Sequence, residues 1–133
     1  MTSRILIVED DPAQRRILEE LVKRFGFDSI AADGGIKGLE VLNGPNGGSI
    51  ELVILDLMMP GMDGFETCRR LKRDAGLHHV PIIFMTGLAE TEHIVRGLEA
   101  GAQEYLPKPF DVAELMARVR TVFRLARAHK DLD

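Results

Sequence analysis

The stretch ILIVEDDP, residues 5–12, passes directly from four aliphatic residues into three acids. An apolar run without polar alternation is typical of a strand in a parallel sheet that helices cover on both faces. Three more short apolar runs end in a polar residue: residues 52–55 in Asp56, residues 80–85 in Thr86 and residues 105–107 in Lys108. Because ligands of such sheets bind at the carboxyl ends of the strands, the sequence predicts a functional site along one edge of the sheet.

Helical patterns alternate with these runs and predict an α/β fold, a doubly wound, five-stranded parallel sheet with five helices. Strands are expected at residues 5–8, 27–32, 51–56, 81–86 and 104–106. Helices are expected at residues 12–25, 36–42, 64–74, 90–100 and 111–130, and residues 43–49 are expected to be a loop. Asp11 has the residue type and position of an N-cap for the first helix. Asp111 and Glu114 have the spacing of a capping box for the last helix.

Length and composition indicate one ordinary globular domain. The chain has 133 residues, of which 45% are hydrophobic and 29% are charged, enough to bury a core without a disulfide or structural metal. Its net charge of −4 argues against direct nucleic-acid binding through this domain, since such binding usually uses a basic face. The single Cys68 excludes an intramolecular disulfide. No apolar run approaches the ~20 residues of a membrane span, so we expect a cytoplasmic protein that does not enter a membrane.

The polar residues at the strand ends form a set with a common chemistry. Glu9, Asp10 and Asp56 would place three carboxylates together, and such a cluster either raises its pKa values or binds a cation. Magnesium prefers oxygen ligands, and it usually takes one or two carboxylates together with phosphate oxygens. Lys108 would add a fixed positive charge and Thr86 a hydroxyl group. These groups are suited to holding a phosphoryl group, whose transfer depends mainly on positioning and charge neutralisation.

The segment after the third expected strand supports this interpretation. In DLMMPGMDG, residues 56–64, a proline and two glycines predict a tight turn before the third helix. Such a turn exposes backbone N–H groups close to Asp56, where they could bind an anion.

Four motifs together resemble those of the receiver domain of a two-component response regulator. They are ILIVEDDP (5–12), DLMMPGMDG (56–64), FMTG (84–87) and YLPKPF (105–110). The resemblance covers about residues 3–127 and implies the flavodoxin-like receiver fold, with a receiver domain at 1–127. Residues 128–133 would then extend the last helix or begin a linker to an output domain. Gly87 departs from the pattern, because many relatives carry alanine there.

The resemblance also implies which residues bind metal and phosphate. Asp56 would be the phosphoacceptor, and a Mg²⁺ (or Mn²⁺) ion would be bound by Glu9, Asp10, Asp56 and the backbone carbonyl of Met58. Thr86 and Lys108 would contact the phosphoryl oxygens, and the backbone amides of Leu57 and Gly87 would complete the phosphate cradle. Tyr105 matches the aromatic switch position that accompanies Thr86, and the Lys108-Pro109 peptide bond is expected to be cis.

The function that follows is a signalling switch operated by phosphorylation, not a conventional turnover enzyme. A histidine kinase or histidine phosphotransfer protein would donate the phosphoryl group, and the surface of the fourth helix, fifth strand and last helix would respond. A degenerate receiver acting only as an interaction module is the alternative, disfavoured because the key residues are all present. A phosphatase of the haloacid dehalogenase type would need an acid where Met58 stands. A flavodoxin-like cofactor binder would need a phosphate loop in place of residues 9–12.

The last expected helix has a basic far half, which contains Arg118, Arg120, Arg124, Arg127 and Lys130. These cations suit the C-terminal end of a helix dipole on a solvated face. The alternative is a helix that leads to an output domain or pairs with a second copy of the chain.

Overall fold

The computed structural model describes residues 3–59, 61–87 and 91–131, with side chains described up to residue 126. Its sheet contains five parallel strands in the order β2-β1-β3-β4-β5. The strands are β1 (Arg4–Val8), β2 (Asp28–Ala32), β3 (Ile50–Asp56), β4 (Ile82–Thr86) and β5 (Glu104–Pro107). The helices are α1 (Pro12–Arg24), α2 (Gly35–Asn43), α3 (Gly64–Arg73), α4 (Thr91–Glu99) and α5 (Val112–Asp131). The predicted doubly wound fold is confirmed.

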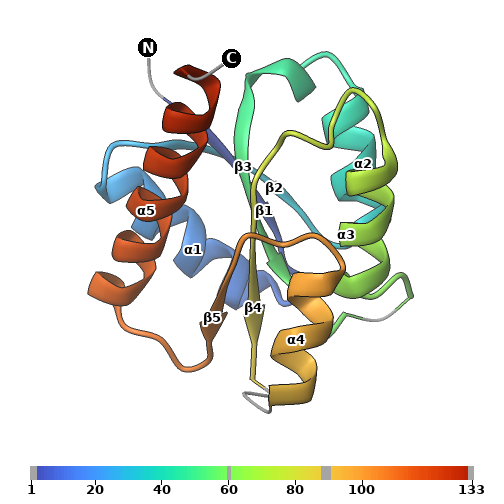
Figure 1. Ribbon diagram of the computed structural model, residues 1–133. Helices are drawn as coiled ribbons and strands as arrows, with labels where there is room; N and C mark the ends of the chain where they lie inside the picture. The colour runs from blue at the N-terminus through green and yellow to red at the C-terminus, as the bar shows by residue number, and fades with distance from the viewer. Residues whose placement is uncertain (1–2, 60, 88–90, 132–133) are drawn as a thin grey trace.

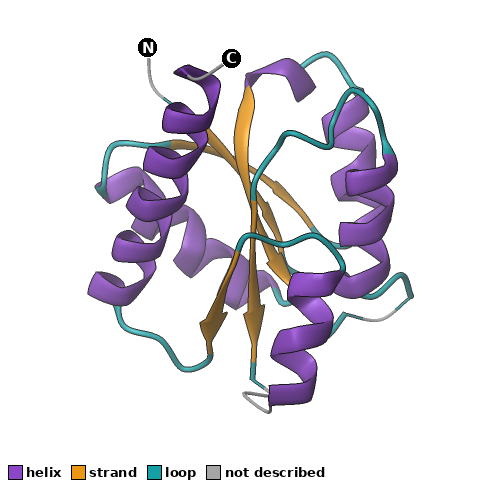
Figure 2. Ribbon diagram, viewed as in Figure 1, coloured by secondary structure: helices purple, strands orange, loops and turns teal. Residues whose placement is uncertain are grey.

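Helices cover both faces of the sheet, as Figure 1 shows, with α1 and α5 on one side and α2, α3 and α4 on the other. Successive residues of β1 therefore enter two different cores: Ile5 and Ile7 pack in one, and Leu6 and Val8 in the other. Side chains alternate between the faces of a strand, so a strand buried on both faces has no polar position. This explains the continuous apolar runs of the sequence, and Figure 2 shows the strands between the two helical layers.

The expected boundaries hold to within a few residues, with one added element. A short 3₁₀ helix, η1 (Gly47–Ser49), lies within the segment that composition predicted only as a loop. Its Ser49 N–H donates to Asn46 O at 3.1 Å, and its Ser49 hydroxyl donates to the same oxygen at 2.6 Å. Gly47 packs so closely on the backbone carbonyl of Leu42 that a β-carbon would collide with it. This tertiary contact has no signature in local composition.

Two glycines bring helices unusually close to the sheet. A β-carbon on Gly64, at the start of α3, would lie 2.5 Å from Leu57 Cα, and the Gly64 N–H donates to Leu57 O at 3.0 Å. A β-carbon on Gly97 of α4 would lie 2.6 Å from the ring of Phe84 in β4. Real β-carbons do not approach so closely, so glycine lets α3 begin directly beside the carboxyl end of β3 and lets α4 rest on the middle of β4.

The two predicted N-caps are present. The Asp11 carboxylate accepts the Ala13 N–H at 2.9 Å at the start of α1. The Asp111 carboxylate accepts the Glu114 N–H at 2.7 Å at the start of α5. Helix α5 runs without a break across residue 127, and the assignment of 128–133 to an extension or linker stays a prediction. Within the described ranges, no helix combines the length and hydropathy needed to cross a membrane.

Candidate functional site

Three carboxylates meet where β1 and β3 end. These strands are neighbours, with Val8 paired to Leu55, so Glu9 and Asp10 emerge beside Asp56. One oxygen from each of the three carboxylates lies within 4.8 Å of the other two. Glu9 and Asp56 are only 1% and 5% exposed, and Asp10 is half-buried. The acidic cluster predicted from the strand ends is therefore present and largely removed from water.

Burial and crowding make Glu9 hard to ionise. Its pKa is raised from 4.5 to about 8, first because the carboxyl is buried and then because the Asp56 carboxylate favours a protonated neighbour. The nearby Lys108 ammonium opposes this rise. Glu9 Oε2 is buried and has no hydrogen-bond partner among the described residues. The cluster thus carries an excess of negative charge and a buried oxygen that could accept a positive ligand.

Lys108 reaches the acidic cluster from the loop after β5. Its Nζ lies 3.1 Å from Asp56 Oδ2 and 3.7 Å from Glu9 Oε1. Its backbone N–H donates to Thr86 O at 2.8 Å, which fixes the loop against the end of β4. The Lys108-Pro109 peptide bond is cis, as expected. The lysine predicted as a site residue therefore contacts the predicted phosphoacceptor.

The turn after Asp56 differs from the expectation at one position. The Leu57 N–H, expected to face a bound phosphate, instead donates to Met85 O at 3.1 Å. The pairing with β4 continues one residue beyond β3, so this amide faces the neighbouring strand. The next amide, that of Met58, donates to Asp56 Oδ1 at 3.1 Å. Met58 N–H is thus the amide that faces the carboxylate, while the Met58 side chain is 57% exposed.

Thr86 and Gly87 occupy the end of β4, beside Asp56. Thr86 is 1% exposed. Gly87 is exposed, and a β-carbon at this position would meet no atom of the described residues within 4 Å. An alanine would therefore fit at residue 87, so the departure from the family pattern changes little in the space around this amide. Residue 88, which follows it, lies outside the described residues.

Tyr105 lies on the edge strand β5, is half-buried, and packs against the core on the face of the sheet that carries α3 and α4. Its ring centroid is 6.1 Å from that of Phe84, and the Arg118 guanidinium carbon lies 5.0 Å from the Tyr105 ring centroid. Arg118 also donates to Glu104 Oε1 at 2.7 Å, and the Tyr105 N–H donates to the same oxygen at 3.0 Å. The Arg118 guanidinium therefore lies over the tyrosine ring, and the Glu104 carboxylate accepts from both Arg118 and the Tyr105 backbone.

The ligand set at the cluster fits a hard divalent cation. All three candidate side-chain ligands are carboxylates, the donors that Mg²⁺ and Mn²⁺ prefer. A cation there would relieve the repulsion that raises the pKa of Glu9. It would also give the buried Glu9 Oε2 a partner. The described residues are thus able to hold a metal ion.

Sequence reasoning missed one residue at this site. Arg15, in α1, donates from Nη1 to Glu9 O at 2.9 Å and lies 3.5 Å from Asp10 O. Helical spacing separates this arginine from Arg16, because Arg15 lies three residues before Leu18 and seven before Val22 and so flanks the buried side of the helix, but it does not reveal the contact with Glu9. The contact depends on how the β1–α1 connection folds back over the first helical turn.

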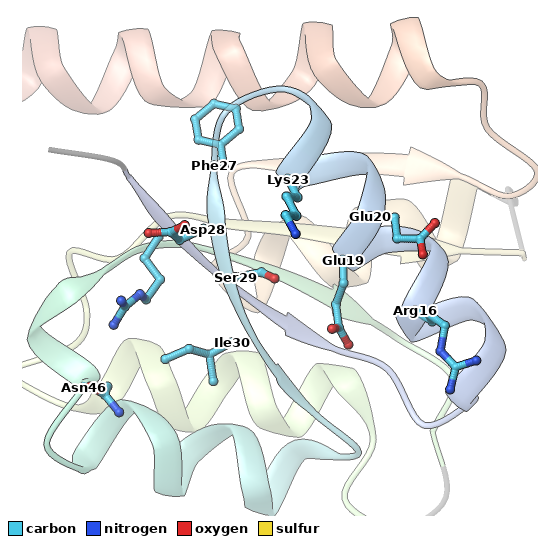
Figure 3. A pocket seen from close by; sticks show the side chains of 10 residues that line it. Arg16, Glu19, Glu20, Lys23, Phe27, Asp28, Ser29, Ile30 and Asn46 are labelled. Atoms are coloured by element: carbon cyan, nitrogen blue, oxygen red, sulfur yellow. The ribbon is translucent and has the colours of Figure 1, made fainter.

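A hollow of about 740 Å³ on another part of the surface is unrelated to the cluster. It lies over β2 at the edge of the sheet and beside α1, as Figure 3 shows. Its charged lining consists of Arg4, Arg16, Lys23, Glu19, Glu20 and Asp28. The three cations balance the three acids, so no excess charge is available there to select a ligand.

The parallel sheet with strand order 2-1-3-4-5 defines a doubly wound α/β domain. Its acidic cluster lies at the carboxyl ends of the strands, which is where ligands bind in this class of fold. The chain belongs to the response regulator receiver domain family, whose model matches residues 5–120. Members of this family are signalling domains rather than turnover enzymes. The acidic triad of Glu9, Asp10 and Asp56 is consistent with the family's phosphoacceptor site.

Curated relatives and solved structures agree with this assignment. The chain is 42% identical over 123 residues to the DNA-binding dual master transcriptional regulator RpaA of Synechocystis sp., an alignment that covers 91% of this chain and 49% of that protein. The chain spans about half the length of the curated relatives it matches.

Two solved structures illustrate the likeness of the fold. The signal receiver domain of a histidine kinase from Syntrophus aciditrophicus matches with a TM-score of 0.82 and 32% identity, over 90% of this chain and 89% of that one. A CheY-like receiver domain protein from Methanospirillum hungatei matches with a TM-score of 0.87 and 25% identity, over 97% of this chain and 99% of that one.

Proposed function

We propose that this domain is a phosphorylation-operated switch in which Asp56 accepts a phosphoryl group. The observation that carries the proposal is the contact of the Lys108 ammonium with Asp56 Oδ2 at 3.1 Å inside a cluster of three carboxylates. A structural ion pair would need one carboxylate, whereas this site gathers three beside one fixed cation. The surplus of negative charge is what a metal-assisted phosphoryl acceptor requires before its ligands arrive.

In the proposed reaction an Asp56 oxygen attacks the phosphorus of a phosphohistidine. The new P–O bond forms as the P–N bond breaks, and the imidazole nitrogen of the donor takes the bonding electron pair. The donor is a histidine kinase or a histidine phosphotransfer protein. The product is an acyl phosphate on Asp56, whose extra negative charge must be neutralised by the groups around it.

The side chains and amides of the site divide this task. Lys108 neutralises a phosphoryl oxygen, and the Thr86 hydroxyl donates to another. The amides of Met58 and Gly87 complete the cradle, with Met58 supported by its present bond to Asp56 Oδ1 at 3.1 Å. A preorganised set of donors of this kind stabilises charge as it develops.

The proposed metal ligands are the carboxylates of Glu9, Asp10 and Asp56 and the backbone carbonyl of Met58. When bound, Mg²⁺ (or Mn²⁺) supplies positive charge to the phosphoryl oxygens and offsets the repulsion between the carboxylates. Before the ion binds, contacts between the residues themselves keep the site ordered. Lys108 bridges two of the acids at 3.1 and 3.7 Å.

The switch that we propose runs from Thr86 to the surface of α4, β5 and α5. Movement of the Thr86 hydroxyl toward the phosphoryl group frees space toward which Tyr105 can turn. Two contacts support this route: the Tyr105 ring lies 6.1 Å from Phe84, and α4 rests on the same Phe84 through Gly97. A change at the end of β4 would therefore reach both α4 and β5.

The downstream partner of this receiver is proposed from the names and lengths of its relatives. Several are named DNA-binding regulators and are about twice as long as this chain. We propose that the receiver signals to an output domain joined through α5, or pairs with a second copy through that helix, in the cytoplasm. Direct nucleic-acid binding by the receiver itself is not proposed, because its net charge is −4.

The test is intact mass after incubation with acetyl phosphate and Mg²⁺. We expect one added phosphoryl group on the wild-type chain and none on Asp56→Asn or in the presence of a chelator. An adduct that persists in Asp56→Asn would place the acceptor elsewhere. No adduct on a folded wild-type chain, with acetyl phosphate and with a phosphorylated histidine donor, would leave the alternative, an interaction module that works without phosphorylation.

A further inference from the structure

The backbone that carries the acidic pair is held by an arginine from the following helix. Arg15 lies on the second turn of α1 and is half-buried. Its Nη1 donates to Glu9 O at 2.9 Å and lies 3.5 Å from Asp10 O. One guanidinium nitrogen, which carries two N–H donors, thus contacts two consecutive carbonyls, and the ammonium of a lysine, on a side chain one bond shorter, would not reach the same position.

The other restraints on this segment act at its two ends. The Glu9 N–H donates to Ala32 O at 3.0 Å and continues the pairing of the sheet. The Asp11 carboxylate caps α1 by accepting the Ala13 N–H at 2.9 Å. Between these points, Arg15 contacts the carbonyls of the two acids themselves. Three carboxylates within 4.8 Å repel one another, so a segment without this contact would relieve the repulsion by moving the acids apart.

We propose that Arg15 is a positioning residue for the cation site: it holds the backbone of Glu9 and Asp10 so that their carboxylates converge with that of Asp56. This inference rests on the proposed function, because the cation belongs to it. Arg15 acts through the backbone carbonyls and touches neither the cation nor the phosphoryl group. A site ordered in advance binds its ligand more tightly, because less conformational freedom is lost on binding.

Arg16 provides a matched control. It is the next residue of the same helix and carries the same charge, but it is exposed and lines the hollow over β2 (Figure 3). Arg15→Met removes the donors and the charge and keeps most of the apolar stem. Arg16→Met makes the same chemical change at a position that does not contact the acidic pair. Arg15→Lys keeps the charge on a side chain that is one bond shorter and so removes the reach of Nη1 to the two carbonyls.

The experiment is a calorimetric titration of the full chain and each variant with Mg²⁺ alone, with thermal unfolding measured with and without the ion. We expect Arg15→Met to weaken Mg²⁺ binding about tenfold, which corresponds to about 1.4 kcal/mol. Arg15→Lys should lie between, and Arg16→Met should stay within about twofold of wild type by the same conversion. The stabilisation that Mg²⁺ gives to the folded chain should shrink in Arg15→Met in the same proportion.

The following outcomes overturn the inference. If Arg15→Met binds Mg²⁺ as wild type does, or if its unfolding midpoint falls equally with and without the ion, the arginine has only a structural role. If Arg16→Met weakens binding as much as Arg15→Met, the contact of Arg15 with the two carbonyls is not what sets the affinity. If Arg15→Met does not fold, Arg15→Lys carries the comparison, and wild-type affinity in that variant overturns the proposal. A wild-type chain that binds no Mg²⁺ removes the proposed function and this inference together, whereas the outcomes seen only in the variants leave the proposed function intact.

Discussion

Lys108 Nζ lies 3.1 Å from Asp56 Oδ2 across 52 residues of chain. The contact joins the loop after the edge strand β5 to the end of the central strand β3, passing over the end of β4. The same ammonium lies 3.7 Å from Glu9 Oε1, so one cation faces two buried acids. Without a metal, this lysine offsets part of the charge of the cluster. With a phosphoryl group on Asp56, its partner would become a phosphoryl oxygen.

Asp56→Asn should abolish phosphorylation and leave the fold intact. The substitution removes the nucleophile and one of three mutually repelling carboxylates, and it also removes the ion pair with Lys108. We expect the free energy of unfolding at pH 8 to equal or exceed that of wild type, by up to about 1 kcal/mol, because repulsion at the cluster falls. Urea unfolding checks this, and a loss of stability would show that the lysine pair outweighs the repulsion.

Stability without metal should fall as pH rises. The Glu9 carboxyl has a pKa of about 8 in the folded chain against 4.5 as its ordinary value. Between these pH values the folded chain keeps a proton that the unfolded chain has lost, so the stabilising contribution is complete below about pH 4.5 and disappears as pH passes 8. Urea unfolding in the presence of a chelator, repeated between pH 5 and 9, measures how the free energy of unfolding changes with pH. Proton linkage relates that slope to the difference in bound protons between the folded and unfolded chain.

Two controls sharpen the pH experiment. Glu9→Gln should remove most of the slope, because the titrating group is absent. Saturating Mg²⁺ should also reduce the slope, because a bound cation favours the ionised carboxylate. A slope in Glu9→Gln equal to that of wild type would assign the effect to another group.

Lys108→Ala should bind Mg²⁺ more tightly and switch less well. Removing a cation 3.1 and 3.7 Å from two candidate ligands leaves more negative charge for the metal, and we expect affinity to rise about three- to tenfold. Phosphorylation should become inefficient, because a phosphoryl oxygen loses its counter-charge. Tyr105 is the only tyrosine and the chain has no tryptophan, so its fluorescence reports the switch directly.

The control for Lys108→Ala is Lys37→Ala, which removes an exposed cation on α2. We expect it to leave both Mg²⁺ affinity and the fluorescence response unchanged. A full phosphorylation-dependent fluorescence change in Lys108→Ala would show that the lysine has no part in switching.

Arg118→Ala should release Tyr105 from its present position. The Arg118 guanidinium carbon lies 5.0 Å from the centroid of the tyrosine ring, and Arg118 is held by Glu104 at 2.7 Å. We expect the unphosphorylated variant to show part of the fluorescence change of phosphorylation, with a stability loss of about 1 kcal/mol or less because the ion pair is partly exposed. Arg120→Ala, an exposed position on the same helix, should change neither, and a wild-type spectrum in Arg118→Ala would contradict the role of the cation.

Gly97→Ala should destabilise the chain by about 1–3 kcal/mol, the usual cost of overpacking. Its β-carbon would lie 2.6 Å from the Phe84 ring, so α4 or the ring must move. The matched change is Gly87→Ala, where the β-carbon would meet no atom of the part of the chain that the structure describes within 4 Å, and it should be neutral. Thermal unfolding of the two variants measures the difference, and equal midpoints would show that α4 adjusts freely.

The sequence predicted those features that arise from local pattern. Strand ends were readable because β1 and β3 are buried on both faces and stop where a polar residue begins, and the carboxylates at these ends do converge. The Asp11 cap was readable for the same reason, since a cap depends on adjacent residues.

Features that depend on neighbouring strands and on loop paths could not be predicted from the sequence. The amide that faces Asp56 is that of Met58 and not Leu57, because pairing with Met85 extends one residue past the strand. The contact of Arg15 with Glu9 O depends on the path of the β1–α1 connection. The η1 turn depends on how Gly47 packs against Leu42. No local property of these residues distinguishes the alternatives.

The contact of Gly97 with Phe84 has a mechanical consequence. Gly97 is the buried residue of α4, and Val95 and Leu98 remain 45% and 41% exposed. At Gly97 the helix therefore meets the sheet through its backbone, and its side-chain contacts come from half-buried residues such as Ile94 and from Arg96, whose guanidinium carbon lies 4.1 Å from the centroid of the Phe65 ring. By contrast, helices α3 and α5 pack into the core through large buried side chains such as Phe65 and Phe123. Because α4 buries no large side chain, we expect a small displacement at the end of β4 to move α4 more readily than α3 or α5.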